Sequence, residues 1–304
     1  MAFSVTEYKF GNHRGLMVYH NEKKHHIDIV PSFGALLARI EFFGHELVEP
    51  LENSRQLEND HWYRNFWLMP FQNRIADGRY VFDHKTYQLP VNEPEKNNAI
   101  HGFFQELDMI EMIHHIADEE VTVKMDFHYD GSKPGYPFPF DCNITYHIHA
   151  RGTLTLNYTI HNIGTSAMPF SCGWHPYFQL EGDRKTWKII AGPLAKQPLN
   201  HRNLPEGAPV AYREEFDLGS NSYDDCFRFE KKPHEIILST ENQQLKIIQD
   251  DLMPYVQIFT PPRNSVAIEP ISSSVDAFNN KKGLQVIQPS DSLSGSIALH
   301  FTQE

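Results

Sequence analysis

Apolar and polar residues alternate along most of this 304-residue chain, which is the pattern of half-buried β-strands. Residues 121–130 show the pattern clearly, because polar side chains separate Val121, Val123, Met125 and Phe127. The same period of two recurs in residues 25–48, 142–164, 235–251, 255–270 and 294–301. We therefore expect β-strands in all six stretches.

Short breaks in the alternation indicate turns, and they fall at residues 31–34, 151–152, 241–242 and 261–264. The stretch 130–141 is rich in Pro and Gly, and strands are expected on both sides of it, so we interpret it as a loop inside one domain. We find no internal repeat, no linker and no sustained helical spacing with caps. The sequence predicts an all-β fold: one domain over residues 1–304, a large antiparallel β-sandwich with few short helices.

Charge and cysteine content narrow the class of protein. With 39 acidic and 27 basic residues, the formal net charge is −12, which disfavours nucleic acid and anionic membranes as partners. The three cysteines, Cys142, Cys172 and Cys226, include no Cys-x-x-Cys pair and do not suggest a disulfide framework. The first ten residues lack the apolar stretch of a secretion signal, and no segment approaches the ~20 apolar residues of a membrane helix. We expect a cytoplasmic location.

Five segments interrupt the alternation with polar side chains beside Gly or Pro: residues 69–80, 97–104, 170–180, 221–227 and 267–280. They contain Asn, Arg, His, Asp and Glu next to aromatic residues. Sugar hydroxyls are bound by amide, carboxylate and guanidinium groups, and the apolar face of a pyranose ring is bound by aromatic side chains. This composition favours a carbohydrate site.

In order and spacing, these segments resemble the aldose 1-epimerase (galactose mutarotase-like) family. The matching motifs are Asn73-Arg74-Ile75, Ile100-His101-Gly102, His175-Pro176-Tyr177-Phe178, Tyr223-Asp224 through Phe227, Tyr255 through Thr260, Glu269-Pro270 and Asp276-Ala277-Phe278-Asn279. Each motif alone is weak, but the ordered set extends over nearly the whole chain. The resemblance implies the galactose mutarotase-like supersandwich and a small-molecule sugar as partner. The resemblance also implies that the protein needs no metal or other cofactor. We expect a monomer or homodimer.

The family's reaction interconverts the α and β anomers of a free aldohexose by opening and closing the sugar ring. A base removes the proton of the C1 hydroxyl while an acid protonates the ring oxygen. The resemblance assigns the base to Glu269, since a carboxylate of ordinary pKa, about 4.3, is ionised at neutral pH. It assigns the acid to His175, because imidazole titrates near neutral pH.

The resemblance also assigns sugar contacts to Asn73, Arg74, His101, Asp224 and Gln257. His101 would form a hydrogen bond to the sugar near C1 or the ring oxygen. Arg74 would donate paired hydrogen bonds from its guanidinium group to sugar hydroxyls.

Two of these assignments have structural alternatives. Arg74 could instead pair with Asp77, and Asp225 is an alternative to Asp224, because only the flanking Tyr223 and Phe227 set the register.

Two positions depart from the family pattern. Phe103 follows Gly102 where the family has a second Gly, and Trp174 precedes His175 where the family often has Thr. We expect both to add bulk near the pocket, and with Tyr177 they could form its aromatic wall, although large aromatic residues more often belong to the core. The identity of the sugar stays open.

The same residues leave three alternative functions open. An epimerase of a phosphorylated hexose would need basic groups such as Arg79 and Lys85 at the cleft. A non-catalytic carbohydrate-binding protein would need neither the acid nor the base. A glycoside hydrolase or lyase would use a carboxyl pair from Asp224, Glu269 and Asp276.

A metal site is disfavoured. His147 and His149 share a strand face, but no Glu follows at the spacing usual for such sites.

Overall fold

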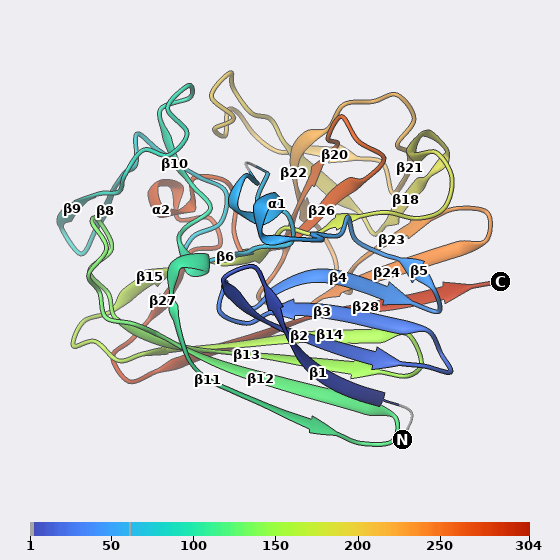
Figure 1. Cartoon of the computed structure of the whole chain (residues 1–304). Helices are drawn as coiled ribbons and strands as arrows, with labels where there is room; N and C mark the ends of the chain where they lie inside the picture. The colour runs from blue at the N-terminus through green and yellow to red at the C-terminus, as the bar shows by residue number, and fades with distance from the viewer. Residues whose placement is uncertain (1–2, 61) are drawn as a thin grey trace.

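The protein is described by a computed structural model that covers residues 3–60 and 62–304. Strands make up 52% of the chain and helices 5%, so the expected all-β class is confirmed. Three antiparallel sheets hold most of the strands, and the layers of a sandwich are visible in Figure 1. Within the described residues, no helix is both long and apolar enough to cross a membrane.

The first sheet is a five-stranded meander in chain order: β1 (Phe3–Phe10), β2 (His13–His20), β3 (His25–Val30), β4 (Leu36–Phe42) and β5 (His45–Glu46). The largest sheet has nine strands, in the order β11 (Asp108–Ile116), β12 (Glu120–Tyr129), β13 (Phe140–His149), β14 (Thr153–Asn162), β28 (Ser292–Gln303), β24 (Gln243–Gln249), β23 (His234–Ser239), β18 (Lys188–Ala191) and β21 (Glu215–Asp217).

An eight-stranded sheet carries most of the polar segments noted in the sequence. Its order is β20 (Val210–Tyr212), β19 (Leu194–Gln197), β22 (Asp224–Phe229), β25 (Tyr255–Phe259), β26 (Val266–Ile271), β16 (Gly173–Trp174) and β6 (Trp67–Leu68), with β17 (Tyr177–Phe178) also on β26. Three small ribbons complete the strands: β7 (Arg74–Ala76) with β10 (Asn98–Ile100), β8 (Arg79–Phe82) with β9 (Lys85–Gln88), and β15 (Met168–Phe170) with β27 (Gln285–Ile287). The helices are α1 (Ser54–Glu58), α2 (Ala277–Asn280) and two 3₁₀ turns, Phe104–Glu106 and Arg184–Thr186.

All six stretches with alternating polarity form strands, and the predicted breaks lie between them. Strand β12 shows why: Val121, Val123, Met125 and Phe127 are fully buried on one face, while the residues between them stay partly exposed. Apolar side chains of the three sheets meet in one continuous core. Removing this area from water is the main force that holds the layers together.

One buried hydroxyl links three parts of this core. Tyr146, on β13, donates its hydroxyl hydrogen to the carbonyl of Ala35, in the turn before β4. The same oxygen accepts a hydrogen bond of 2.8 Å from the indole nitrogen of Trp67, on β6. A single side chain therefore satisfies one polar group from each of the other two sheets.

Tyr146→Phe should lower the free energy of unfolding by about 1–3 kcal/mol, because it leaves the Trp67 N–H and the Ala35 carbonyl unpaired in the core. Denaturant unfolding of the purified variant measures this. Tyr19→Phe, on the partly exposed face of β2, is the control and should change stability by less than about 0.5 kcal/mol. Equal effects of the two substitutions would contradict the linking role of Tyr146.

Candidate active site

A cavity of about 780 Å³ opens beside the eight-stranded sheet, within the size range of small-molecule sites. Segments from all parts of the chain line it. The lining includes every side chain that the sequence assigned to the site: Asn73, Arg74, His101, His175, Asp224, Gln257 and Glu269. Residues almost 200 positions apart in the sequence are thus brought to one place.

Strand register places three of these side chains together. On β25 and β26, Gln257 lies directly opposite Glu269, so their side chains project on the same face of the sheet. Asp224 of β22 lies on that face too, because it is two residues from Cys226, the partner of Gln257. Asp225 projects on the opposite face, where it forms an ion pair of 2.8 Å with Lys196. Only Asp224 of the two candidates lines the cavity.

His175 and Glu269 contact each other at the cavity wall. The Nε2 atom of His175 lies 3.3 Å from the Oε1 atom of Glu269, and both side chains are almost fully buried. The ring of Tyr177 stacks parallel to the imidazole, with 5.0 Å between ring centroids, and fixes its plane. Among the described residues, the other carboxyl oxygen of Glu269 has no hydrogen-bond partner. That oxygen therefore has unused hydrogen-bonding capacity in a buried position.

The environment favours the uncharged forms of both groups. Burial lowers the pKa of His175, and the charge of Arg74 adds to this effect. Burial and the negative charge of Asp224 raise the pKa of Glu269 well above its usual value. Glu269 is therefore not simply an ionised carboxylate, as its ordinary pKa had suggested. Both shifts act against a charge on either group, so the site favours a pair without net charge.

The backbone near Asn73 and His101 is held in an unusual conformation. Both residues have positive φ angles, 55° and 65°, which cost free energy for side chains other than glycine. Gly102 follows with φ at 67°, and a Cβ atom there would lie 2.1 Å from the carbonyl oxygen of Met69. This close approach explains why a glycine follows His101.

The backbone N–H of Asn73 fixes the tautomer of His101. It donates a hydrogen bond of 3.3 Å to Nδ1 of that imidazole. Because burial and the neighbouring His175 lower the pKa of His101 well below its usual value, its ring is neutral and carries its proton on Nε2. His101 can therefore offer one N–H donor to a ligand.

Arg74 is held by Glu93, not by Asp77. The Nε and Nη2 atoms of Arg74 donate to the Glu93 carboxylate at 2.9–3.1 Å, in the paired geometry that makes such contacts strong. Burial tends to raise the pKa of Glu93, but the bonds from Arg74 and Asn98 outweigh it and the pKa is lowered. Arg74 also contacts the side-chain oxygen of Asn73 at 3.3 Å. Of its five N–H groups, two have no partner among the described residues and stay available to a ligand.

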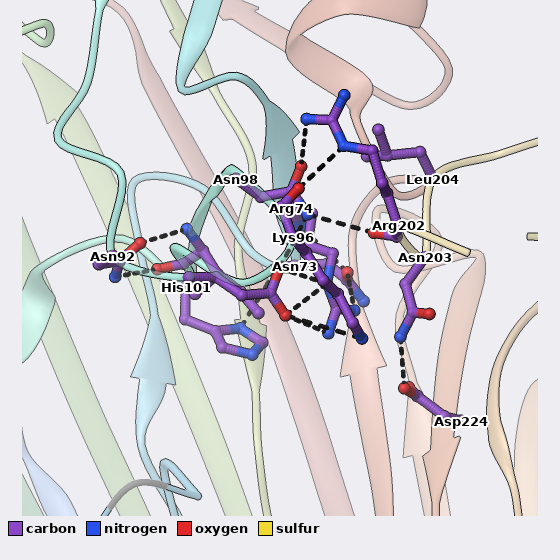
Figure 2. A network of polar contacts seen from close by, with 12 residues as sticks. Asn73, Arg74, Asn92, Lys96, Asn98, His101, Arg202, Asn203, Leu204 and Asp224 are labelled. Atoms are coloured by element: carbon purple, nitrogen blue, oxygen red, sulfur yellow. Dashed lines mark hydrogen bonds and ion pairs between the residues drawn. The ribbon is translucent and has the colours of Figure 1, made fainter. Parts of the chain in front are cut away.

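Asp224 is held by side-chain amides. Gln257 donates to one carboxylate oxygen at 2.8 Å, and Asn203 donates to the other at 2.5 Å, as Figure 2 shows for Asn203. Asn73 in turn donates to the oxygen of Gln257 at 3.3 Å. With both oxygens already accepting one hydrogen bond, Asp224 is oriented to accept further hydrogen bonds from ligand hydroxyls.

The two departures from the family pattern do not fill the cavity, and the expectation that they would was wrong. Phe103 is buried against Tyr129 and Tyr136 in the core. Trp174 is also fully buried, and its indole N–H donates to the carbonyl of Asn65. Neither side chain lines the cavity, whereas Tyr177 does. The bulk of both residues serves the core.

Several lining residues were not assigned from the sequence. Glu93 precedes a proline, as Glu269 does, and this repeated Glu-Pro pair could have drawn attention to it. Trp62 and Tyr63 lie in a segment that mixes aromatic and charged residues, the same composition as the assigned segments. Asn203 does not line the cavity but holds Asp224, and it had no such feature because it stands in an ordinary polar turn.

The charge of the lining is mostly negative. Its carboxyl side chains are Glu58, Asp60, Glu93, Glu95, Asp224 and Glu269, against the cations Arg74 and Lys96. Arg79 and Lys85, the basic residues considered for a phosphate group, are exposed on the ribbon of β8 and β9 and do not line the cavity. In the part of the chain that the structure describes, no cluster of three or more His, Cys, Asp or Glu side chains is arranged to hold a metal ion.

Comparison with known proteins agrees with this picture. The chain is 26% identical over 279 residues to the uncharacterized protein YihR of Escherichia coli, with 87% of this chain and 86% of that protein covered. It is 32% identical over 145 residues to the galactose mutarotase of Rattus norvegicus, which covers 45% of this chain and 40% of the rat protein.

Solved structures share the fold over the full chain. A galactose mutarotase-like protein from Clostridium acetobutylicum superposes with a TM-score of 0.89 at 20% identity, covering 100% of this chain and 99% of that one. Galactose 1-epimerase from Lactobacillus acidophilus gives a TM-score of 0.83 at 12% identity, covering 99% and 98%. The family model described as aldose 1-epimerase matches residues 18–300. This chain therefore belongs to the aldose 1-epimerase family.

Proposed function

We propose that the protein interconverts the α and β anomers of a free, unphosphorylated aldohexose by acid–base ring opening and closure. The observation that carries this proposal is the contact of 3.3 Å between Nε2 of His175 and Oε1 of Glu269 at the cavity wall. The ring oxygen and the C1 hydroxyl oxygen of a sugar are bonded to the same carbon. An acid and a base that lie side by side can reach both oxygens at once.

In the ring-opening step, Glu269 as carboxylate removes the proton of the C1 hydroxyl. The C1–O bond of the ring breaks as the carbonyl forms, and His175 as imidazolium gives its proton to the ring oxygen. Rotation about C1–C2 then presents the other face of the aldehyde. Ring closure reverses the transfers: His175 takes back the proton from the sugar hydroxyl, and Glu269 returns its proton to the new C1 oxygen.

The pair carries one proton throughout this cycle. It starts as imidazolium with carboxylate and becomes neutral imidazole with carboxylic acid when the ring is open. Burial favours the second form, and the Coulomb attraction of adjacent charges stabilises the first. The proton therefore has a place on either group, as a reversible anomer exchange requires.

The remaining groups would hold the sugar in place. Arg74 has two free N–H groups and His101 one, so both act as donors to sugar oxygens. Asp224 acts as an acceptor, and Gln257 and Asn73 orient it. Tyr177 and Trp62 offer aromatic surface to the apolar face of the ring.

The alternatives fit this site less well. Among the described lining residues, a phosphorylated hexose would meet six carboxyl groups and two cations, one of which is already paired with Glu93. Non-catalytic sugar binding gives no reason to bury an acid–base pair, which costs free energy. Glycoside hydrolysis uses two carboxyl groups, but the group that contacts Glu269 here is an imidazole.

Polarimetry tests the proposal directly. Freshly dissolved α-D-glucose and α-D-galactose are followed at neutral pH, with and without the protein, in the presence of a chelator. Faster approach to the same final rotation supports anomer exchange, and the ratio of the two rates begins to identify the sugar. No acceleration with either sugar would count against the proposal; turnover of hexose 6-phosphates or of aryl glycosides would then favour the alternatives.

His175→Asn and Glu269→Gln should each lower kcat by about 10²–10⁴-fold, because each removes one of the two proton-transfer groups while keeping the shape of the side chain. Polarimetry measures the rate, and circular dichroism checks the fold. The double variant should be little worse than either single one, since the two groups act as a unit. Full activity of both single variants would show that the chemistry lies elsewhere.

The rate should be nearly constant around neutral pH and fall in both acid and alkali. In acid the pair gains a second proton and the base is lost, and in alkali it loses its only proton and the acid is lost. Asp224→Asn removes a negative charge that raises the pKa of Glu269, so the alkaline fall should begin at lower pH. Asp225→Asn, on the opposite face of β22, is the matched control and should leave the pH of the alkaline fall unchanged. An alkaline limb that moves upward in Asp224→Asn would refute this electrostatic coupling.

A further inference from the structure

A short turn outside the cavity contacts Asp224 directly and is linked to Arg74 through Asn98 and Glu93. Residues 199–205 connect β19 to β20, closed by the bridge between Leu199 and Pro205. The Asn200 side-chain oxygen accepts hydrogen bonds from the backbone N–H groups of Arg202 and Leu204. None of these residues lines the cavity, so they do not touch a ligand there.

Leu204 attaches this turn to the sheet that bears the site. It is buried in a small apolar cluster with Cys226, Ile271 and Val275. Cys226 lies on β22 and Ile271 on β26, the two strands that carry Asp224 and Glu269. The apolar contact thus sets the position of Arg202 and Asn203, which precede Leu204 in the turn.

Arg202 forms the first of two polar contacts with the site. Its guanidinium donates to the backbone carbonyls of Lys96 and Asn97, each at 2.8 Å, and to the side chain of Asp77 at 2.8 Å.

The carbonyl of Arg202 accepts a hydrogen bond of 3.1 Å from the side chain of Asn98. Asn98 also donates to the Glu93 carboxylate at 2.8 Å, and Glu93 holds Arg74. Figure 2 shows Arg74, Asn98 and Arg202 within this network of polar contacts.

Asn203 forms the second contact. Its side-chain amide donates to the Asp224 carboxylate at 2.5 Å, so it supplies one of the two amide donors on that group. Asn203 has a φ of 56°, the left-handed conformation that asparagine tolerates better than most residues. The residue with this backbone conformation, Asn203, is therefore also the one whose side chain contacts Asp224 in the cavity wall.

We propose that the turn of residues 199–205 positions the sugar-binding groups, and that Asn203 is the positioning residue that sets the orientation of Asp224. The inference rests on the proposed function, since it assigns to Asp224 the role of accepting a hydrogen bond from a sugar hydroxyl. Gln257 and Asn203 occupy one lone pair on each oxygen of Asp224. The lone pairs that remain have fixed directions, and a sugar is selected by whether it has a hydroxyl that donates along them.

The test uses Asn203→Gly, because glycine accepts the positive φ and removes only the amide. The substrates are the sugar that is turned over fastest and its single-position deoxy analogues. For the parent sugar, kcat/KM should fall about tenfold, the usual effect of losing a hydrogen bond to a charged group. For the one analogue that lacks the hydroxyl bound by Asp224, it should fall by less than about threefold. Asp224→Asn should weaken discrimination against the same analogue.

Asn242→Gly, in the exposed turn between β23 and β24, is the matched control and should leave kcat/KM and the discrimination unchanged. A purely structural role of Asn203 would lower activity equally for all analogues, which would overturn the proposal. If Asn203→Gly keeps the kcat/KM and the discrimination of the wild type, the positioning role is overturned too, while the proposed function stands.

If the wild-type protein accelerates no sugar, the proposed function fails and the positioning role is decided by a crystal structure of Asn203→Gly. An Asp224 carboxylate that has rotated away from its contact with Gln257 supports the positioning role of Asn203. An Asp224 side chain that stays in place refutes it.

Discussion

An imidazole and a carboxyl group that are both removed from water cannot hold independent charges, because each charge would lose its hydration without full compensation. His175 and Glu269 are in this situation: they are buried and in contact, and their surroundings shift the pKa of the first down and of the second up. The pair is therefore limited to states with one shared proton. The other polar groups of the site are arranged around that constraint, because an unbalanced charge beside the pair would shift the pKa values of both members.

The polar groups around the pair meet this requirement by pairing with one another. Arg74 is balanced by Glu93, and the charge of Asp224 is stabilised by the amides of Gln257 and Asn203. Arg74 and Asp224 still have hydrogen-bonding capacity at the cavity. Because these groups come from separate ribbons, strands and a turn, their relative positions depend on how the sheets pack. The precision of the site is thus a property of the core as much as of the site residues.

The sequence predicted the fold class, and the residues that it assigned to a site line one cavity. Strands such as β12 and β13 bury one face, so their alternation is visible in the sequence. Strands β1 and β11 were not predicted: β1 buries only its two end residues, and β11 leaves Ile110 and Ile113 exposed, so neither shows a clean pattern. The position of Phe103 was predicted wrongly because the left-handed turn at His101 and Gly102 directs the next side chain into the core. The contacts of Glu93 and Asn203 depend on loops that meet only in the folded chain.

The place of β28 in the nine-stranded sheet has a consequence for folding. This strand follows all the others in sequence, yet it lies between β14 and β24 and pairs with both (Figure 1). Until it is inserted, the sheet consists of two halves, each with an unpaired strand edge that can associate with other chains. During synthesis the earlier strands must therefore wait for β28 before the sheet can close. A chaperone that shields the edges of β14 and β24 during this interval would protect the protein at its most aggregation-prone stage.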